Sequence, residues 1–209
     1  QASNNERYLH YQASLMQHEK ILYLCTGSAF TGNYATAKGW KEKTSHGDTF
    51  QLIDTGAASG RLGVIALLTA RFAKTGAAAE EVVSFANNLS QRAEEYVFID
   101  ALKYLVAGGR ISRPKAFFAD LMHMKPVISP WFEGVRKMGV VRNQKSQIAF
   151  ALKKLEPYRN KSRALFVLLQ YSYNKKWLLE TVQPQLYTLL PDAEILLVPL
   201  SLTSGVHMG

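Results

Sequence analysis

A predicted strand, turn and helix near the start of the chain constrain the fold more than any other feature. Residues 21–25 form an apolar run of the length expected for a buried strand, the turn 26–28 breaks it, and residues 29–40 carry apolar side chains at helical spacing. Such a junction leaves amide N–H groups without backbone partners, and together with the helix dipole they favour an anion. Ser28 and Thr31 add hydroxyl donors, so the segment predicts a site for either a phosphate or a carboxylate.

The same pattern is repeated further along the chain. A predicted strand over 49–54 is followed by a turn of small residues, 55–60, and by a long apolar helix over 62–73. Two strand–turn–helix units in succession favour βαβ connections and a parallel sheet. Because ligands of such sheets bind at the carboxyl ends of the strands, both turns are expected at the same edge.

The second half of the chain predicts another α/β region with different strand connections. Residues 125–130 and 135–142 look like two strands joined as a hairpin through 131–134, so the sheet of this region is expected to be mixed or antiparallel. The change of pattern divides the chain into a first subdomain, 1–93, and a second subdomain, 94–209. The other predicted helices cover 1–19, 77–92, 101–106, 114–122, 144–155 and 175–189, and the other predicted strands cover 96–99, 164–171 and 193–200.

Composition narrows the class of protein. Hydrophobic residues make up 47% of the 209 positions and charged residues 20%, which is typical of a globular protein with a buried core. No apolar run is long enough to span a bilayer, and no signal peptide is expected from the residues that follow Gln1. The single cysteine, Cys25, excludes an internal disulfide framework, so a cytoplasmic location is expected. Within an apolar strand this thiol is expected to be an inert part of the core.

The net charge of +9 indicates a basic surface, with much of the charge in the second half of the chain. Such a surface is either ordinary solvated surface or a face that docks nucleic acid, an acidic protein or anionic lipid headgroups. No RNA- or DNA-reading motif accompanies the charges, and they are scattered rather than aligned with aromatic residues. No nucleic-acid partner is therefore expected, and a nucleic-acid-binding module is kept only as an alternative. Transient contact with a membrane is compatible with the charge.

Motifs for catalysis or metal binding are missing from the sequence. The five histidines have no metal-ligand spacing, and G-x-S-x-G, Walker A and G-x-G-x-x-G motifs do not occur. Residues 60–63 resemble a degenerate phosphate loop, but tight packing of a helix on a sheet explains their glycines equally well. The sequence therefore predicts no catalytic residue, no metal and no cofactor. The alternative is an enzyme or binding protein for a phosphorylated small molecule that uses the turn 26–28.

Two further segments offer groups that bind anions. Gly108 and Gly109 give the backbone unusual freedom just before Arg110, whose guanidinium suits bidentate recognition of a carboxylate or phosphate. A helix end followed by a surface arginine explains the same pattern equally well. His207 follows the last predicted strand and can reach a ligand at the edge of a sheet, although spacing alone favours an ordinary terminal loop over 204–209.

Five segments, in order along nearly the whole chain, resemble the DegV (EDD-fold) family, the fatty-acid-binding proteins that include the binding subunit of bacterial fatty acid kinase. Residues 26–34 are similar to the family's S-S-x-L-S-G-T-Y segment, and residues 54–63 to its D-S-x-x-x-S-x-G-x-G segment. Residues 100–111 match D-T-L-E-Y-L-x-x-G-G-R-I most closely, residues 125–128 match K-P-I-L, and residues 205–209 match G-V-H-T-G.

The resemblance implies a non-enzymatic carrier that holds one long-chain fatty acid in an apolar tunnel between two α/β subdomains. Its carboxylate is expected to be held by Ser28, Arg110 and His207, together with backbone amides. A separate kinase subunit is expected to phosphorylate the bound carboxylate for phospholipid synthesis, which agrees with the lack of a nucleotide motif here. Further head-group contacts are expected from the two turns, at Gly27, Thr31, Gly32 and Ser59.

The chain also departs from the family pattern. Gly27 replaces the first serine of the usual pair, and Asn33 replaces a threonine. Residues 1–3 look like the end of the family's T-S-Q-x-S motif, so the strands before this motif, and the family's final glycine-rich turn, are expected to lie outside the chain. With glycine in the first position of the serine pair, Ser28 carries more of the head-group assignment.

Overall fold

The computed structural model describes residues 3–45, 47–100, 125–159 and 165–208, without the side chains of residues 207 and 208. The chain divides into two compact units, each with its own hydrophobic core. The first unit comprises Gln1–Glu94 with Pro130–Gly134, and the second comprises Glu95–Ser129 with Val135–Gly209. The chain thus has the expected mixed α/β fold, with both parallel and antiparallel strand pairs.

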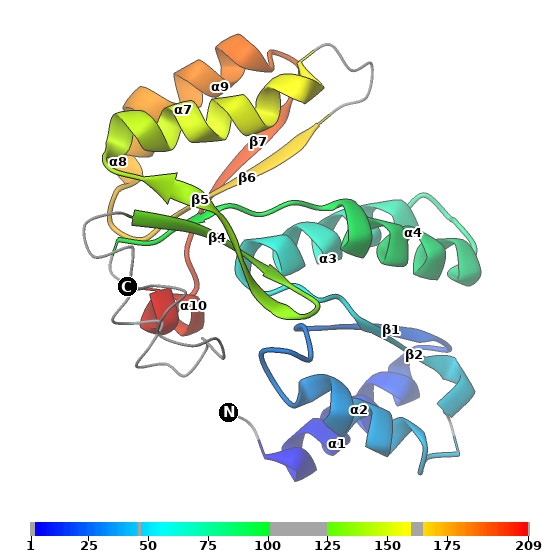
Figure 1. The fold of residues 1–209 in the computed structure, drawn as a ribbon. Coiled ribbons are helices and arrows are strands. Elements are labelled where there is room, and N and C mark those ends of the chain that lie inside the picture. The colour runs from blue at the N-terminus through cyan, green and yellow to red at the C-terminus, as the bar shows by residue number, and fades with distance from the viewer. Residues whose placement is uncertain (1–2, 46, 101–124, 160–164, 209) are drawn as a thin grey trace. The chain divides into compact units, whose positions relative to one another are not determined.

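The first unit contains a two-stranded parallel sheet. Strand β1 (Ile21–Cys25) pairs with β2 (Phe50–Asp54) in register over all five residue pairs, which confirms the predicted parallel pairing. A short 3₁₀ turn, Gly47–Thr49, precedes β2. Helices α1 (Asn4–Gln17) and α2 (Asn33–Lys41) lie beside this sheet (Figure 1).

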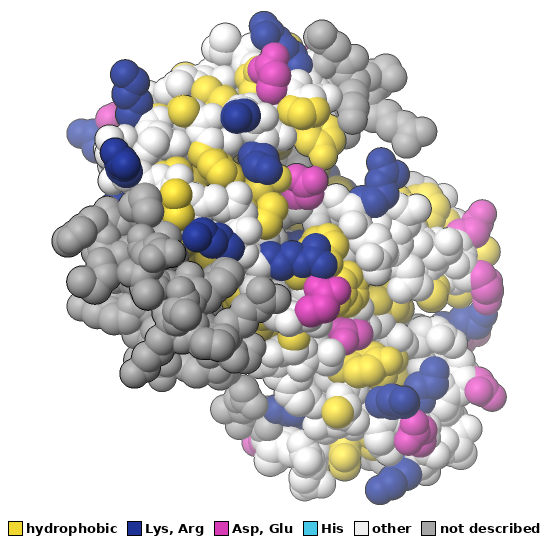
Figure 2. All heavy atoms as spheres, viewed as in Figure 1, with side chains coloured by type: hydrophobic (Ala, Val, Ile, Leu, Met, Phe, Trp, Pro, Cys, Tyr) yellow, Lys and Arg dark blue, Asp and Glu magenta, His cyan; other side chains and the backbone are white. Residues whose placement is uncertain are grey.

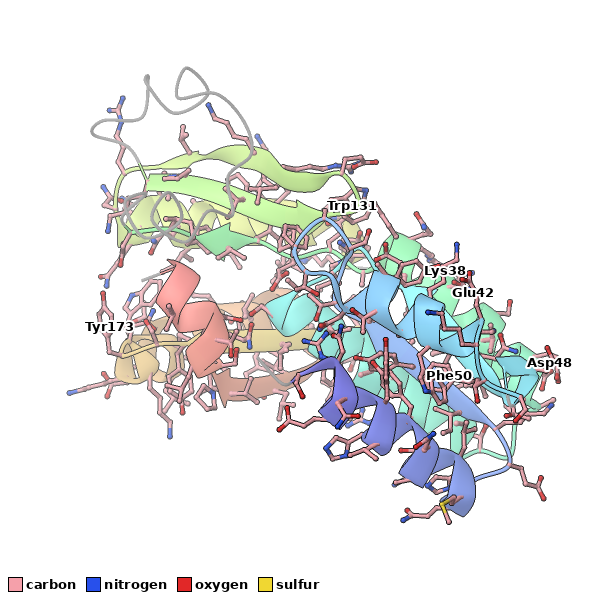
Figure 3. The ribbon with its side chains drawn as sticks, turned by 90° about the horizontal axis from the view of Figure 1, so that it is seen from below. Lys38, Glu42, Asp48, Phe50, Trp131 and Tyr173 are labelled. Atoms are coloured by element: carbon pink, nitrogen blue, oxygen red, sulfur yellow. The ribbon has the colours of Figure 1, made fainter. Side chains whose placement is uncertain are left out.

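Aromatic side chains fill the core between these helices and the sheet. Tyr11 of α1, Trp40 of α2 and Phe50 of β2 are buried, and each pair of these three rings has centroids 5.2 Å apart. Phe50 is labelled in Figure 3. Ser3 caps α1: its hydroxyl accepts the Glu6 N–H (3.2 Å), and the Glu6 carboxylate accepts the Ser3 N–H (2.6 Å).

The helix after β1 begins later than its sequence pattern predicts. Residues 29–32 form turns, in which the Phe30 N–H donates to the Gly27 carbonyl (2.9 Å), and α2 starts only at Asn33. The prediction of a helix from residue 29 is therefore wrong. The Thr31 hydroxyl accepts the Asn33 N–H (3.0 Å), and such local side-chain bonds compete with helical ones.

The helix after β2 begins earlier than predicted. Helix α3 (Ser59–Ala73) starts inside the predicted turn, and α4 (Ala79–Arg92) follows it. The two helices pack against each other, and the rings of Phe72 and Phe85 stack with centroids 4.5 Å apart. This packing covers apolar side chains of both helices.

The second unit contains two separate sheets among its described residues. Strands β3 (Val97–Phe98), β4 (Lys125–Trp131) and β5 (Gly134–Val141) follow the order β3-β4-β5, and β3 runs antiparallel to β4. The predicted hairpin between β4 and β5 is confirmed, and its tip, 130–134, belongs to the first unit. Strands β6 (Phe166–Tyr171) and β7 (Glu194–Pro199) pair in parallel.

Helices cover the β6–β7 sheet. Helix α7 (Gln144–Leu155) continues into a 3₁₀ turn, Glu156–Tyr158, and lies beside α9 (Gln183–Leu189) (Figure 1). Leu178, Val182 and Leu186 form the core of this layer together with apolar side chains of α7, β6 and β7.

The helical stretch that ends in α9 is interrupted by a π-helical turn. Helix α8 (Lys175–Trp177) leads into this turn, Leu178–Val182, and α9 then continues past Pro184. Proline lacks the N–H that an α-helical bond requires, and a π turn just before it accommodates the missing bond.

The end of the chain is helical. Helix α10 spans Leu202–Met208, so the prediction of a terminal loop over 204–209 is wrong for the described residues. Ser201 explains the difference, because its hydroxyl accepts the Ser204 N–H (3.2 Å) and caps the helix. The helices predicted over 101–106 and 114–122 lie outside the described residues.

Candidate functional site

The two turns with hydroxyl groups lie at the same edge of the β1–β2 sheet, as the parallel pattern predicts. Cys25 and Asp54 pair at the carboxyl ends of the two strands. Beyond them the turns are joined by hydrogen bonds: the Gly27 N–H donates to the Ala57 carbonyl (2.8 Å), and the Thr55 hydroxyl donates to the Cys25 carbonyl (2.7 Å). The first unit thus presents one continuous edge made of two short loops.

The two loops approach each other more closely than side chains would allow. A Cβ added to Gly27 would lie 2.8 Å from the carbonyl carbon of Gly56. Gly56 has φ +58°, and a Cβ there would lie 2.5 Å from Cγ of Phe132 at the hairpin tip. Glycine is therefore required at both positions.

Asp54 holds the two loops together through its side chain. Its Oδ1 accepts the Ser28 N–H and the Gly56 N–H, both at 3.1 Å. The sequence pattern predicts that the amide N–H groups of this turn bind an anionic ligand, but the Ser28 N–H already donates to a carboxylate of the chain itself. The hydroxyl-bearing residue Ser28 is exposed, so its side chain is accessible to a ligand.

The other candidates in these loops have different local roles. The Thr31 hydroxyl oxygen accepts the Asn33 N–H. Gly32 is exposed and immediately precedes α2. Gly27 is buried, so it contributes only backbone. Ser59 begins α3 with φ +50°, a left-handed conformation that is uncommon for serine and often marks functional sites.

Arg61 points into the protein and away from solvent. It is only 2% exposed, and its guanidinium donates to the carbonyls of Gly56 (3.3 Å), Pro130 (2.7 Å) and Ser90 (2.5 Å). Residues 60–63 form the start of α3 with Gly60 and Arg61 buried, which favours the packing interpretation over a phosphate loop.

The aromatic ring beside Arg61 belongs to the tip of the β4–β5 hairpin. The centroid of the Trp131 ring lies 3.8 Å from the guanidinium carbon, and that of Phe132 lies 5.9 Å from it. Trp131 is labelled in Figure 3. The short distance to Trp131 is that of a stacked guanidinium and indole.

Cys25 is an inert core residue, as expected. Its side chain is fully buried, and burial raises the pKa of the thiol to about 12, with a smaller contribution from the nearby Asp54 carboxylate. The thiolate is the nucleophilic form of cysteine, so this side chain is protonated and unreactive at neutral pH.

The remaining predicted site residues belong to other segments. Arg110, with Gly108 and Gly109, lies outside the described residues. His207 lies in α10, but its side chain is also outside the description. Of the predicted site residues, Gly27, Ser28, Thr31 and Gly32 lie in the segment between β1 and α2, and Ser59 is the first residue of α3 after the second loop.

Two other motif residues meet within the second unit. The Lys125 ammonium pairs with the Asp100 carboxylate at 2.5 Å, and the Tyr173 hydroxyl lies 3.5 Å from the other oxygen of Asp100. Tyr173, labelled in Figure 3, is 82% exposed, and both members of the ion pair are substantially exposed. An ion pair in such contact with water contributes little to stability.

Within the described ranges, no group of three or more His, Cys, Asp or Glu side chains is placed to hold a metal ion. None of the helices that the structure describes combines the length and the apolar character needed to cross a membrane.

Sequence reasoning missed three features of this edge. Asp54 was recognisable as a strand-terminal carboxylate, but not as the acceptor for both loops. Arg61 and Trp131 are far apart in the sequence, and only the glycines at the start of α3 indicated close packing there.

A family model described as an uncharacterised protein of the DegV family matches residues 1–209, so the chain belongs to the DegV family. A DegV domain-containing protein of Caldanaerobacter subterraneus is 26% identical to it over 152 residues, which cover 73% of this chain and 54% of that protein. The chain thus spans about half the length of this relative.

Solved structures show the same fold. A DegV family protein from Thermus thermophilus, whose structure reports fatty acid binding, has a TM-score of 0.86 and 23% identity, covering 100% of this chain and 74% of its own. The fatty acid kinase (Fak) B3 protein of Streptococcus pneumoniae, loaded with linoleic acid, has a TM-score of 0.83 and 16% identity, covering 100% of this chain and 73% of its own. At these identities the likeness shows the fold alone.

Proposed function

We propose that this protein binds a long-chain fatty acid and holds its carboxylate at the edge formed by the two loops of the first unit. The Ser28 hydroxyl donates a hydrogen bond to the carboxylate, and Arg110 and His207 supply basic groups that bind it. Gly27, Thr31, Gly32 and Ser59 shape the surrounding loops. The exposed Ser28 hydroxyl at the carboxyl end of a parallel strand, in a chain of the DegV family, carries the proposal.

The acyl chain supplies most of the binding energy in this proposal. Each buried CH₂ group contributes roughly 0.8 kcal/mol, so a long chain in an apolar tunnel outweighs any single head-group bond. Polar groups at the carboxylate then fix the orientation of the ligand. The proteins of T. thermophilus and S. pneumoniae, which share this fold and bind fatty acids, support the choice of ligand.

The same edge suits a phosphate less well than a carboxylate. Asp54 already places a negative charge against the Ser28 and Gly56 amides. A phosphate carries nearly two negative charges and is repelled more strongly by this carboxylate than a singly charged fatty acid. A phosphorylated small molecule is therefore the second candidate.

The bound fatty acid is presented to a separate kinase that phosphorylates the carboxylate, and this protein itself performs no catalysis. The charge distribution supports an anionic partner. The first unit holds nine Lys and Arg against nine Asp and Glu, so the second unit has sixteen against seven and carries the whole net charge of +9. Among the described side chains on the face in Figure 2, Lys and Arg are spread out rather than gathered in one patch.

Native mass spectrometry of the purified protein tests the proposed ligand. We expect one fatty acid per chain, either retained from the cells or taken up after delipidation and incubation with oleic acid. A protein that takes up no fatty acid under either condition contradicts the proposal. If the protein binds a sugar phosphate specifically and oleic acid does not displace it, the second candidate is favoured instead.

A further inference from the structure

Arg61 connects three segments that are far apart in the sequence of the first unit. Its guanidinium donates to Gly56 after β2, to Ser90 near the end of α4 and to Pro130 at the tip of the hairpin. Carbonyls in the last turn of a helix lack intrahelical partners, and a cation is favoured at this negative end of the helix dipole. The arginine thus binds backbone that would otherwise be poorly satisfied in a buried place.

The hairpin tip connects Arg61 to the candidate ligand site through direct contacts. Trp131 stacks on the Arg61 guanidinium, and the neighbouring Phe132 ring lies directly against Gly56. The backbone of Gly56 in turn lies against Gly27, the residue before Ser28. A continuous series of close contacts therefore leads from Arg61 to the loop that carries the proposed carboxylate ligand.

We propose that Arg61 is a positioning residue that, through Trp131 and Phe132, holds the Gly27–Ser28 and Gly56 loops in the geometry that binds the fatty acid carboxylate. This inference rests on the proposed function for the identity of the ligand. Arg61 itself does not contact the ligand, because it is buried and directed at backbone carbonyls.

The chemistry of the side chain matters as well as its charge. A guanidinium is planar, so it stacks on an indole while its N–H groups donate in several directions within that plane. Lysine keeps the charge but has neither the flat surface nor the fixed fork of donors. Arg61→Lys therefore removes the positioning geometry while it retains a buried cation near the same carbonyls.

The test measures hydrogen exchange of the loop amides and fatty acid affinity in Arg61→Lys. The Gly27 and Ser28 N–H groups are suitable reporters because each donates a hydrogen bond to the end of β2 or to the segment that follows it, and the Gly56 N–H reports on that segment because it donates to the same Asp54 carboxylate as Ser28. We expect their exchange to accelerate by about tenfold or more, as for a locally opened segment, and oleic acid affinity to fall about fivefold. Arg71→Lys, on the exposed side of the same helix, is the matched control and is expected to change neither quantity.

A second pair of variants keeps the test decisive if Arg61→Lys does not fold. Trp131→Leu removes the stacking surface and leaves Arg61 in place, so it is expected to accelerate exchange of the same three amides. Trp131→Phe restores an aromatic face and is expected to recover most of their protection and of the affinity. If the tip only fills space, phenylalanine is expected to recover only a minor part of the protection, because it is little larger than leucine and clearly smaller than tryptophan.

The outcomes separate this inference from the proposed function. Unchanged exchange at the three amides overturns it, and so does an acceleration that is equal in the β1 and β2 amides, which indicates general destabilisation. Faster local exchange with unaltered affinity also overturns it. If the wild-type protein binds no fatty acid, the proposed function fails, and the exchange measurement alone still decides whether Arg61 holds the loops.

Discussion

The backbone of Gly27 lies so close to that of Gly56 that a Cβ at position 27 would be 2.8 Å from the Gly56 carbonyl carbon. The neighbour is backbone, fixed by Phe132 on its other side, so it cannot move aside as a flexible side chain would. The DegV pattern has a serine where this chain has Gly27, and the close contact explains why this chain has a glycine there.

Substitution of Gly27 by serine should therefore destabilise the protein. Forcing extra atoms into such a contact costs typically about 1–3 kcal/mol, and we expect a loss of this size in the free energy of unfolding measured with urea. Gly39→Ala in α2 is the control, since a Cβ there meets nothing within 4 Å. Alanine in a helix interior is expected to raise stability by about 0.5–1 kcal/mol. Equal effects of the two substitutions would contradict the close-contact explanation.

Replacement of Ser28 by alanine separates binding from folding. The side chain is exposed, and the backbone N–H that bonds to Asp54 is retained, so the free energy of unfolding should change by less than about 0.5 kcal/mol. The lost hydroxyl should lower fatty acid affinity about tenfold, the loss expected for a hydrogen bond to a charged group.

Isothermal titration with oleic acid measures this loss of affinity. Ser84→Ala, on the exposed face of α4, controls for removal of a surface hydroxyl. Equal affinity in wild type and Ser28→Ala would remove Ser28 from the site.

Asp54→Asn tests whether the carboxylate of the chain opposes that of the ligand. Asparagine can still accept the Ser28 and Gly56 N–H groups, but these bonds lose their charge, so stability should fall by about 1 kcal/mol. Removal of a nearby negative charge should raise affinity for a fatty acid about fivefold, since two like charges about 4 Å apart repel by about 1 kcal/mol when water screens them. Weaker binding would instead mean that the charge of Asp54 serves mainly to organise the loops.

Local patterns predicted much of the fold of the first unit. The parallel strands of this unit, and the hairpin whose tip belongs to it, each depend on residues close in sequence or on simple periodicity. The start of α2 was not predictable in this way, because one hydroxyl bond from Thr31 delays the helix.

The candidate site was predictable only in part. The hydroxyl-bearing loops at the ends of β1 and β2 followed from the sequence, and the parallel register places them together. The contacts that fix them are non-local: Asp54 bonds to a residue 26 positions away, and Arg61 to one 69 positions away. No periodicity in the sequence records such pairs, because they depend on how separate elements pack.

Cys25 gives a prediction for stability at alkaline pH. Burial raises the pKa of its thiol from 9.0 to about 12, so above pH 9 the unfolded chain releases a proton that the folded protein retains. Unfolding becomes easier as pH rises, and the contribution of the protonated thiol is lost by about 1.4 kcal/mol per pH unit through this window. Other buried groups titrate there as well, so the difference between wild type and Cys25→Ala is the quantity to measure.

Urea unfolding of both proteins between pH 8 and pH 11 provides that difference. At pH 8 the wild type should be the more stable protein, because alanine leaves a small cavity in the core. Above pH 9 its advantage should shrink steadily and then reverse, whereas parallel curves for the two proteins would show that the thiol titrates normally in the folded state. A thiol reagent at pH 8 should likewise leave Cys25 unmodified in the folded protein and react fully in urea, because the folded protein holds almost no thiolate.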